Sequence, residues 1–224
     1  MNERALPAVL LTLTLVTGVV DAVSFLGLGR IFTANMTGNI VFLGFAAAGA
    51  AGLSAARSGV ALAAFAGGAI VAGRMEARMR TGPRYRWLGI AFALEAALLF
   101  ASAAVANGSG TDLTGLEPIL YAVIVLTGLA MGIRNGTVRK LGVADLTTTV
   151  LTLGIAGLAA DSSFAGGANQ GWKRRAASVV AMLAGAALGA WLSRSSLALA
   201  LGTAGLICTA CALAFAGMRA ASGR

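Results

Sequence analysis

Polar side chains that could bind a solute are concentrated in two stretches of an otherwise apolar chain, residues 18–39 and 132–152. Hydroxyl and amide groups supply hydrogen-bond donors and acceptors together, and this combination suits a polar or ionic ligand. Thr33 and Thr37 are spaced to share one helix face. Hydrogen bonding between tightly packed helices is the alternative role. The candidate solute-binding residues are Asp21, Thr33, Asn35, Thr37, Asn39, Asn135, Thr148 and Thr152.

The two stretches also match one another. A glycine stands three residues before Asp21 and before Asn135, and a Leu-Gly pair and a threonine-rich segment follow in both stretches. The motifs begin 114 residues apart, and aligning them fully requires one inserted residue. They predict an internal duplication with halves at residues 5–106 and 117–218. Four apolar segments in each half predict a tandem arrangement in the same orientation. A chance match in a chain rich in Ala, Gly and Thr is the alternative.

Two acidic residues lie inside apolar segments, where ionisable groups are costly and usually face a cavity or a partner. Asp21 lies near the end of the first segment, and Glu95 lies in the middle of the fourth. Arg30, Arg134 and Arg139 are candidate partners of Asp21. Two hypotheses stay open. One is a structural ion pair that joins the halves, and the other is coupling to a proton or cation, with Glu95 protonated reversibly.

The segments that carry these residues are expected to be membrane helices. The chain has 224 residues, 58% hydrophobic and 11% charged, whereas soluble domains contain about 25% charged residues. One span needs roughly 20 residues, and few segments show the alternation of a β-barrel strand. We predict one all-α transmembrane domain over residues 1–224, a polytopic bundle of seven to eight apolar helices. The segments lie at about 5–28, 31–52, 58–75, 87–106, 117–133, 144–160, 176–193 and 197–218.

Basic residues lie mainly between the apolar segments, so the net charge of +9 indicates membrane topology rather than nucleic-acid binding. Residues 74–86 contain five arginines and are predicted to be cytoplasmic, whereas residues 107–117 contain acidic residues only and are predicted to lie outside. Arg30 is predicted to lie inside. Segment 144–160 is open. If it crosses, the chain has eight spans; if it is re-entrant, the chain has seven, and residues 173–175 lie inside, as the positive-inside rule favours.

The residue types needed for metal or redox chemistry are scarce. The chain has no histidine, and Cys208 and Cys211 lie inside an apolar segment. Because a redox CxxC motif belongs near a βαβ pattern in a soluble fold, we interpret the cysteines as small residues on a packed helix. The sequence predicts no cofactor, no metal, no catalytic residue and no enzyme activity.

The motifs resemble those of the YoaK-like bacterial membrane family, catalogued as domain of unknown function 1275. The resemblance covers about residues 8–216 and implies an inner-membrane protein of about six or seven spans, with no established substrate or reaction. The family usually continues Val-Thr-Gly-Thr where residues 151–154 here are Leu-Thr-Leu-Gly, which removes a glycine that would match the first motif. The motifs that carry the resemblance are Gly18-Val-Val-Asp21-Ala, Asn35-Met36-Thr37-Gly38-Asn39 and the stretch from Asn135 to Thr149.

These observations predict a bacterial inner-membrane transporter or permease for a small polar or ionic solute, with the lipid bilayer as its surroundings and no nucleic-acid partner. The alternative is a non-transporting membrane interaction or sensor protein. Spacings such as Gly128-x3-Gly132 permit close helix contact within one chain or in a homo-oligomer. An intramembrane enzyme is the least favoured class, because no persuasive Ser/Lys dyad or cluster of metal-binding carboxylates is present.

Overall fold

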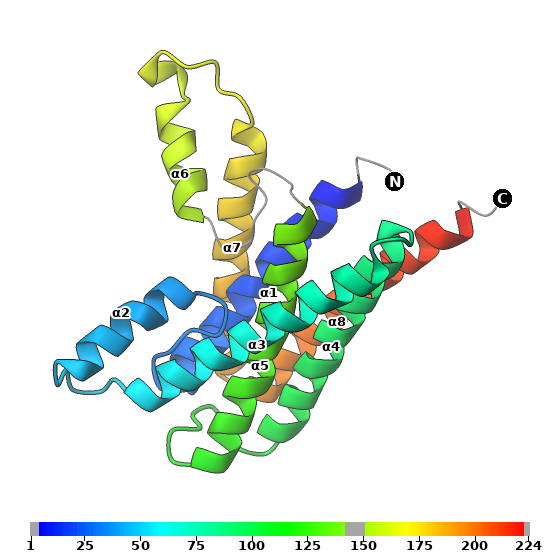
Figure 1. The fold of residues 1–224 in the computed structure, drawn as a ribbon. Coiled ribbons are helices and arrows are strands. Elements are labelled where there is room, and N and C mark those ends of the chain that lie inside the picture. Colours follow the sequence, from blue (N-terminus) through cyan, green and yellow to red (C-terminus); the bar gives the residue numbers. More distant parts are fainter. Residues whose placement is uncertain (1–4, 142–150, 222–224) are drawn as a thin grey trace.

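The computed structural model describes residues 5–141 and 151–221, and these residues form eight α-helices, one short 3-10 helix and no strand (Figure 1). Each of the eight predicted apolar segments overlaps one of these helices, which confirms the all-α prediction. The elements are α1 Ala5–Gly27, α2 Met36–Ala47, α3 Ala55–Met79, α4 Arg84–Ala106, α5 Glu117–Leu141, α6 Leu151–Ala160, η1 Ser163–Ala165, α7 Trp172–Ser193 and α8 Leu197–Ala221.

Six of these helices are long and apolar enough to cross a membrane, whereas α2 and the described part of α6 are shorter. α2 has 12 residues and the described part of α6 has 10, and at 1.5 Å per residue such lengths reach only about half of the roughly 30 Å hydrocarbon layer. The described residues thus contain six candidate spans, and the prediction that segment 144–160 either crosses or is re-entrant is not tested, because residues 142–150 lie outside the described residues. Segment 31–52 was expected to cross, but its helix begins only at Met36, because the preceding residues turn back along α1.

The α1–α7 pair packs closely and in parallel. A Cβ added at Gly185 would collide with the carbonyl of Leu15, and one added at Gly189 would lie 2.7 Å from the carbonyl oxygen of Val19. Residue numbers thus rise together along α1 and α7, so the two helices are parallel. Glycine permits this approach because the two backbones come into direct contact.

The α3–α5 pair has the same parallel arrangement. A Cβ at Gly128 would lie 2.9 Å from the Cβ of Ala64, and one at Gly136 would lie 2.8 Å from the Cβ of Ala72. Residue numbers again rise together along both helices.

The remaining long helices are antiparallel to their neighbours. Gly89 of α4 lies near Ala212 of α8, and Phe100 lies near Gly205, so residue numbers run in opposite directions along this pair. Short turns join α7 to α8 and α3 to α4, and each pair reverses direction. Consequently α1, α4 and α7 point one way, and α3, α5 and α8 point the other way.

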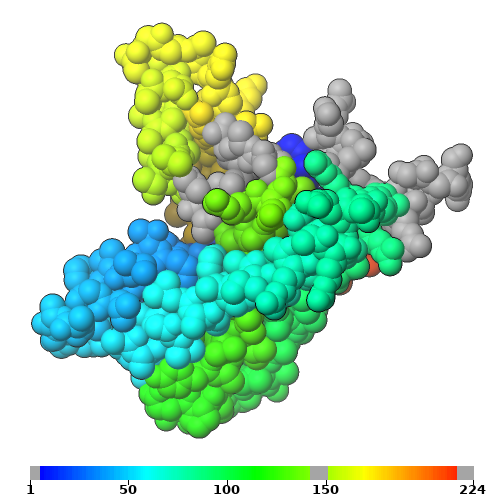
Figure 2. Space-filling model, viewed as in Figure 1, coloured from blue at the N-terminus to red at the C-terminus, as the bar shows by residue number. Residues whose placement is uncertain are grey.

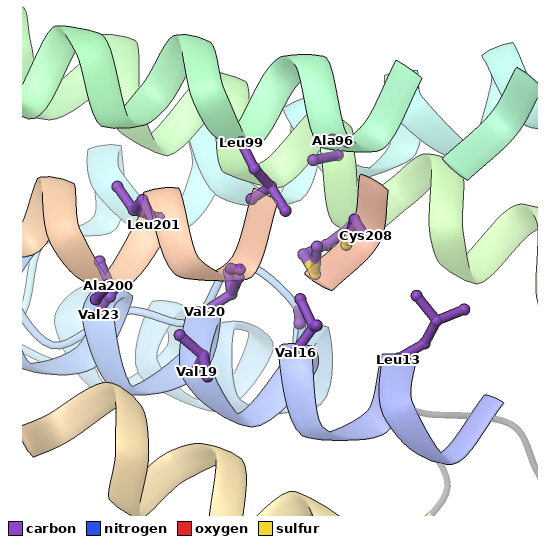
Figure 3. Close-up of a cluster of buried hydrophobic side chains, with 14 of the residues drawn as sticks. Leu13, Val16, Val19, Val20, Val23, Ala96, Leu99, Ala200, Leu201 and Cys208 are labelled. Carbon is purple, nitrogen blue, oxygen red and sulfur yellow. The ribbon is translucent and has the colours of Figure 1, made fainter. Parts of the chain in front are cut away.

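The apolar core lies between α1, α4, α5 and α8. Leu13, Val16 and Val20 of α1 are buried beside Leu99 of α4 and Leu201 of α8 (Figure 3). The short helices instead stand out from this bundle on different sides, α2 packed on α3 and α6 packed on α7 (Figures 1 and 2). The long helices therefore form a closely packed bundle. The short helix α2 and the described part of α6 pack against its outside.

Candidate solute-binding site

The segment between α1 and α2 turns back along α1 and positions the first part of the site. Gly29 and Arg30 have φ angles of 80° and 58°, and this left-handed conformation reverses the chain where α1 ends. The ring of Phe32 then stacks on those of Phe25 and Phe42, with centroid distances of 5.3 and 5.8 Å, and the Phe25 and Phe42 rings also contact one another at 6.5 Å. The stacked rings hold the returning segment beside the end of α1.

Two buried polar side chains bind the main chain of this returning segment. Asn39 accepts a hydrogen bond from the Phe32 amide at 2.9 Å and donates one to the Phe32 carbonyl. Asp21 accepts a hydrogen bond from the Ala34 amide at 3.2 Å. Asn39 is fully buried, so its side-chain amide is used inside the protein and does not line the cavity described next.

A cavity of about 430 Å³ lies where the start of α2 meets Leu151 and Thr152 of α6. Four residues predicted from the sequence line it together: Asp21 of α1, Asn35 and Thr37 at the start of α2, and Thr152 of α6. Apolar side chains such as Met182 of α7 form much of the remaining wall. A mostly apolar cavity of this size with a few convergent polar groups is typical of a small-molecule site.

Asp21 is the one charged residue among the described residues that line this cavity. Its side chain is 6% exposed. Within residues 5–141 and 151–221 it forms no ion pair, and Arg30, Arg134 and Arg139, its predicted partners, do not pair with it. Among the described residues, the Asp21 carboxyl group in this cavity therefore has the Ala34 amide as a hydrogen-bond partner and forms no ion pair.

A second cavity, of about 340 Å³, shares Asn35 and Thr37 with the first. Asn135 and Arg139 of α5 line it. Asn135 also donates a hydrogen bond to the Met131 carbonyl at 2.8 Å. The start of α2 thus contributes to both cavities, and the residues that match in the two sequence motifs, Asp21 and Asn135, each line one of them.

The structure does not bring every predicted site residue to a cavity. Thr33 is fully buried, and its hydroxyl has no hydrogen-bond partner among the described residues. The prediction that Thr33 and Thr37 share one helix face is wrong, because α2 begins only at Met36. Thr148 lies outside the described residues.

Glu95 lines neither cavity and forms an ion pair with Arg134, and both side chains are completely buried. Arg134 also donates hydrogen bonds to the Leu13 carbonyl at 2.7 Å and to the Thr17 hydroxyl at 2.9 Å. The thiol of Cys208 donates to the Glu95 carboxylate at 3.1 Å. This cluster joins four helices, α1, α4, α5 and α8, and Figure 3 shows Leu13 and Cys208 on facing helices beside the core.

The cluster corrects one sequence prediction and adds a residue to the site. Arg134 was one of three candidate partners of Asp21, but its guanidinium is paired with Glu95, which is 39 positions away in the chain. Thr17 was not predicted, although it lines the cavity beside Asp21. Its spacing of four residues from Asp21 was the available signal, because residues i and i+4 share a helix face.

The long apolar helices, the buried ion pair and the polar cavity define a polytopic helical membrane protein. The chain belongs to the family described as protein of unknown function DUF1275, whose model matches residues 9–214. The expected resemblance is thereby confirmed, and the chain is an integral membrane protein of this family.

A curated relative carries a membrane description. The chain is 36% identical over 151 residues to the UPF0700 transmembrane protein YoaK of Bacillus subtilis (strain 168). The match covers 67% of this chain and 64% of the relative, so the chain spans less than two thirds of that protein's length. No solved structure matches the chain significantly.

Proposed function

We propose that the protein is an inner-membrane transporter or permease for a small polar or ionic solute, and that the solute binds in the cavity beside Asp21. The observation that carries the proposal is the meeting of the short helix α2 and the described part of α6 at a cavity that is also lined by residues of α1 and α7 and contains a few polar groups. In transporters, discontinuous helices of this kind end near the middle of the membrane and form the site.

The chemistry of the cavity supports a ligand with hydrogen-bonding groups. Asn35, Thr37 and Thr152 offer amide and hydroxyl groups, and Asp21 offers a carboxyl group that forms no ion pair within the described residues. An ionisable residue within a membrane segment usually faces a substrate or ion pathway, a relay or a partner. Asp21 is therefore the residue proposed to recognise the solute or its coupling ion.

The role proposed for Glu95 as a proton-coupling group has less support from the geometry. Its carboxylate is paired with Arg134 inside the bundle and lines neither cavity. Thr17 provides an indirect connection, because it accepts a hydrogen bond from Arg134 and lines the cavity beside Asp21. Proton coupling through Glu95 stays a prediction.

The proposal includes no catalytic step, cofactor or nucleic acid, and its partners are the bilayer and the solute. The second candidate is a non-transporting interaction or sensor protein, in which the same small-residue helix faces serve assembly, including homo-oligomers. The apolar surface of α6 favours it: none of its residues is buried, and Leu153 is 70% exposed. Such a surface suits either lipid or a partner helix.

The first test is thermal unfolding of the purified protein in detergent, across a panel of inorganic ions and small metabolites. Wild type is compared with Asp21→Asn, and Asp112→Asn is the matched control because Asp112 lies in an exposed loop. A ligand at about 100 times its Kd stabilises the folded state by about 2.7 kcal/mol. Stabilisation of wild type and the control, but not of Asp21→Asn, is the expected result. If no compound stabilises wild type and Asp21→Asn only lowers the melting temperature, the second candidate is favoured.

A further inference from the structure

Five glycines allow the paired long helices to approach so closely that an added Cβ would collide with main-chain atoms of the partner helix. In three of the contacts the glycine fits against a carbonyl and the amide four residues later, and two of these three glycines, Gly18 and Gly132, belong to the sequence motifs. In the other two contacts the glycine fits against the backbone of a single residue. The contacts are Gly18 with Met182 and Ala186, Gly132 with Phe65 and Ala69, Gly68 with Leu129 and Ile133, Gly185 with Leu15, and Gly189 with Val19.

The α1–α7 contacts and the α3–α5 contacts involve equivalent residues, which are related by two constant differences in residue number. Adding 114 to an α1 position gives the α5 position, so Gly18 becomes Gly132 and Leu15 becomes Leu129. Adding 117 to an α3 position gives the α7 position, so Gly68 becomes Gly185, and the other α3 contact residues convert in the same way. The shift of 114 is also the separation of the two sequence motifs. The close contacts between glycines and the partner backbone therefore repeat with the same spacing as the two sequence motifs.

The repeated units point in opposite directions. α7 is parallel to α1, α8 is antiparallel to α7, and α4 is antiparallel to α8, so α4 points the same way as α1. α3 is antiparallel to α4 and parallel to α5. α1 and α5 are therefore antiparallel. Each half contributes three long helices and one short helix, and an odd number of crossings inverts the second half. We infer that the chain is an inverted-topology duplication, in which α2 and α6 enter the membrane from opposite sides and meet at the cavity. The expectation of two halves in the same orientation is wrong for the helix directions observed.

The short helices have the positions that this inference requires. α2 begins where the Ala34 amide meets Asp21, six residues before the end of α1, and leads back to the end of the bundle where α3 begins. The first described residues of α6, Leu151 and Thr152, line the same cavity beside Met182, and the helix leads from there to the opposite end, where Arg175 pairs with Asp161 at 2.6 Å. Each short helix thus runs from the cavity to a different end of the bundle.

The two cavities are counterparts under the same shifts. Asp21 in the first cavity corresponds to Asn135 in the second, and Met182 in the first corresponds to Phe65 in the second. Asn35 lines both. The duplication therefore provides two related half-sites, one carrying a carboxyl group and the other an amide, on either side of the start of α2. This inference concerns membrane topology and does not depend on transport.

The charges agree with six crossings. Among basic residues whose side chains the structure describes, three lie at the end of the bundle where α1 finishes, whereas ten lie at the other end, which we call the basic end. Arg30 belongs to the three, so its predicted cytoplasmic position is wrong in this topology. By the positive-inside rule the basic end is cytoplasmic. The three are Arg30, Arg57 and Arg194, and the ten are Arg74, Arg78, Arg80, Arg84, Arg86, Arg139, Lys140, Lys173, Arg174 and Arg175.

The test is side-specific labelling of single introduced cysteines in intact cells with a membrane-impermeant maleimide, before and after permeabilisation. The native cysteines are buried, so the parent protein is the unlabelled control. The five positions are exposed; four lie in segments that connect helices, and Ser163 begins the short 3-10 helix η1 between α6 and α7. Each variant is first required to melt within a few degrees of the parent, and Ala51→Cys replaces Ala50→Cys if needed. The variants are Ala50→Cys, Thr81→Cys, Thr111→Cys, Ser163→Cys and Ser195→Cys.

The inverted topology predicts that Ala50→Cys, Thr111→Cys and Ser195→Cys are labelled in intact cells, whereas Thr81→Cys and Ser163→Cys are labelled only after permeabilisation. A protease-sensitive tag placed ahead of α1 is expected on the same side as Thr81. Labelling of Thr111 and Ser163 from the same side would mean that α6 crosses, and a tag on the side of Ala50 would mean that α2 crosses. Either result overturns the inference.

Discussion

The substitution Glu95→Gln is expected to destabilise the protein strongly, because it removes the negative charge that faces a fully buried arginine. Glu95 and Arg134 are both 0% exposed. Without the carboxylate, the Arg134 guanidinium would keep its bonds to the Leu13 carbonyl and the Thr17 hydroxyl, but its charge would be uncompensated. Removing one partner of a buried ion pair costs about 3–5 kcal/mol, which is a change of roughly 10² to 10⁴ in the folding equilibrium constant.

The matched control is Glu117→Gln, which removes the carboxylate of a surface ion pair. Arg57 and Glu117 are 2.7 Å apart, but their side chains are 18% and 52% exposed. Because solvent screens such a pair, its loss costs at most about 1 kcal/mol. The difference between the two single variants therefore isolates the effect of burial on a carboxylate-to-amide change of the same size.

The assay is equilibrium unfolding in mixed detergent micelles, followed by helical circular dichroism and tryptophan fluorescence. A third variant, Glu95→Leu combined with Arg134→Met, removes both charges and is expected to recover most of the lost stability, because apolar replacements of a buried pair are often neutral. The reasoning is refuted if Glu95→Gln costs no more than Glu117→Gln. It is also refuted if the double variant is less stable than Glu95→Gln.

Three further predictions follow from packing and burial. Gly185→Leu is expected to lower the melting temperature strongly, because its Cβ would collide with the backbone of α1, whereas Gly202→Leu has open space around the added Cβ and is expected to be neutral; equal effects would contradict the α1–α7 contact. Asn39→Ala is expected to cost about 1–3 kcal/mol by leaving both polar groups of the Phe32 peptide without their partner, and thermal unfolding measures it; an unchanged melting temperature would show that other groups hold this turn. The native cysteines are buried and are expected to react with maleimide only after unfolding, as mass spectrometry would show, and labelling of the folded protein would contradict their burial.

Much of the secondary structure could be predicted from the sequence, because membrane helices depend on local composition. A run of about 20 apolar residues has few alternatives to a helix in lipid, since all its backbone groups must be paired within the segment. Eight apolar segments therefore correspond to eight helices. The grouping of Asp21, Asn35, Thr37 and Thr152 around one cavity was also predictable, because matching motifs pointed to these positions.

Other features depend on contacts between distant parts of the chain. The sequence indicated that Glu95 and Arg134 were costly charges within apolar segments, but their pairing requires α4 and α5 to pack side by side. Asn39 has the same residue type as Asn35 and lies in the same motif, yet it faces the Phe32 peptide instead of the cavity. The orientation of the returning segment decides between these roles, and that orientation depends on its packing against α1.

The sequence by itself determined that the chain is a bundle of membrane helices with paired polar motifs. The tertiary structure alone decided how many helices are long enough to cross and which way each one points. The physical reason is that hydropathy measures how apolar a segment is, whereas crossing depends on where the helix begins and ends. In α2 the Asp21–Ala34 hydrogen bond and the Asn39 contacts with Phe32 keep residues 28–35 out of the helix. That local competition for backbone hydrogen bonds shortens the helix. Each helix that follows therefore points the opposite way from the direction it would have if segment 31–52 crossed the membrane.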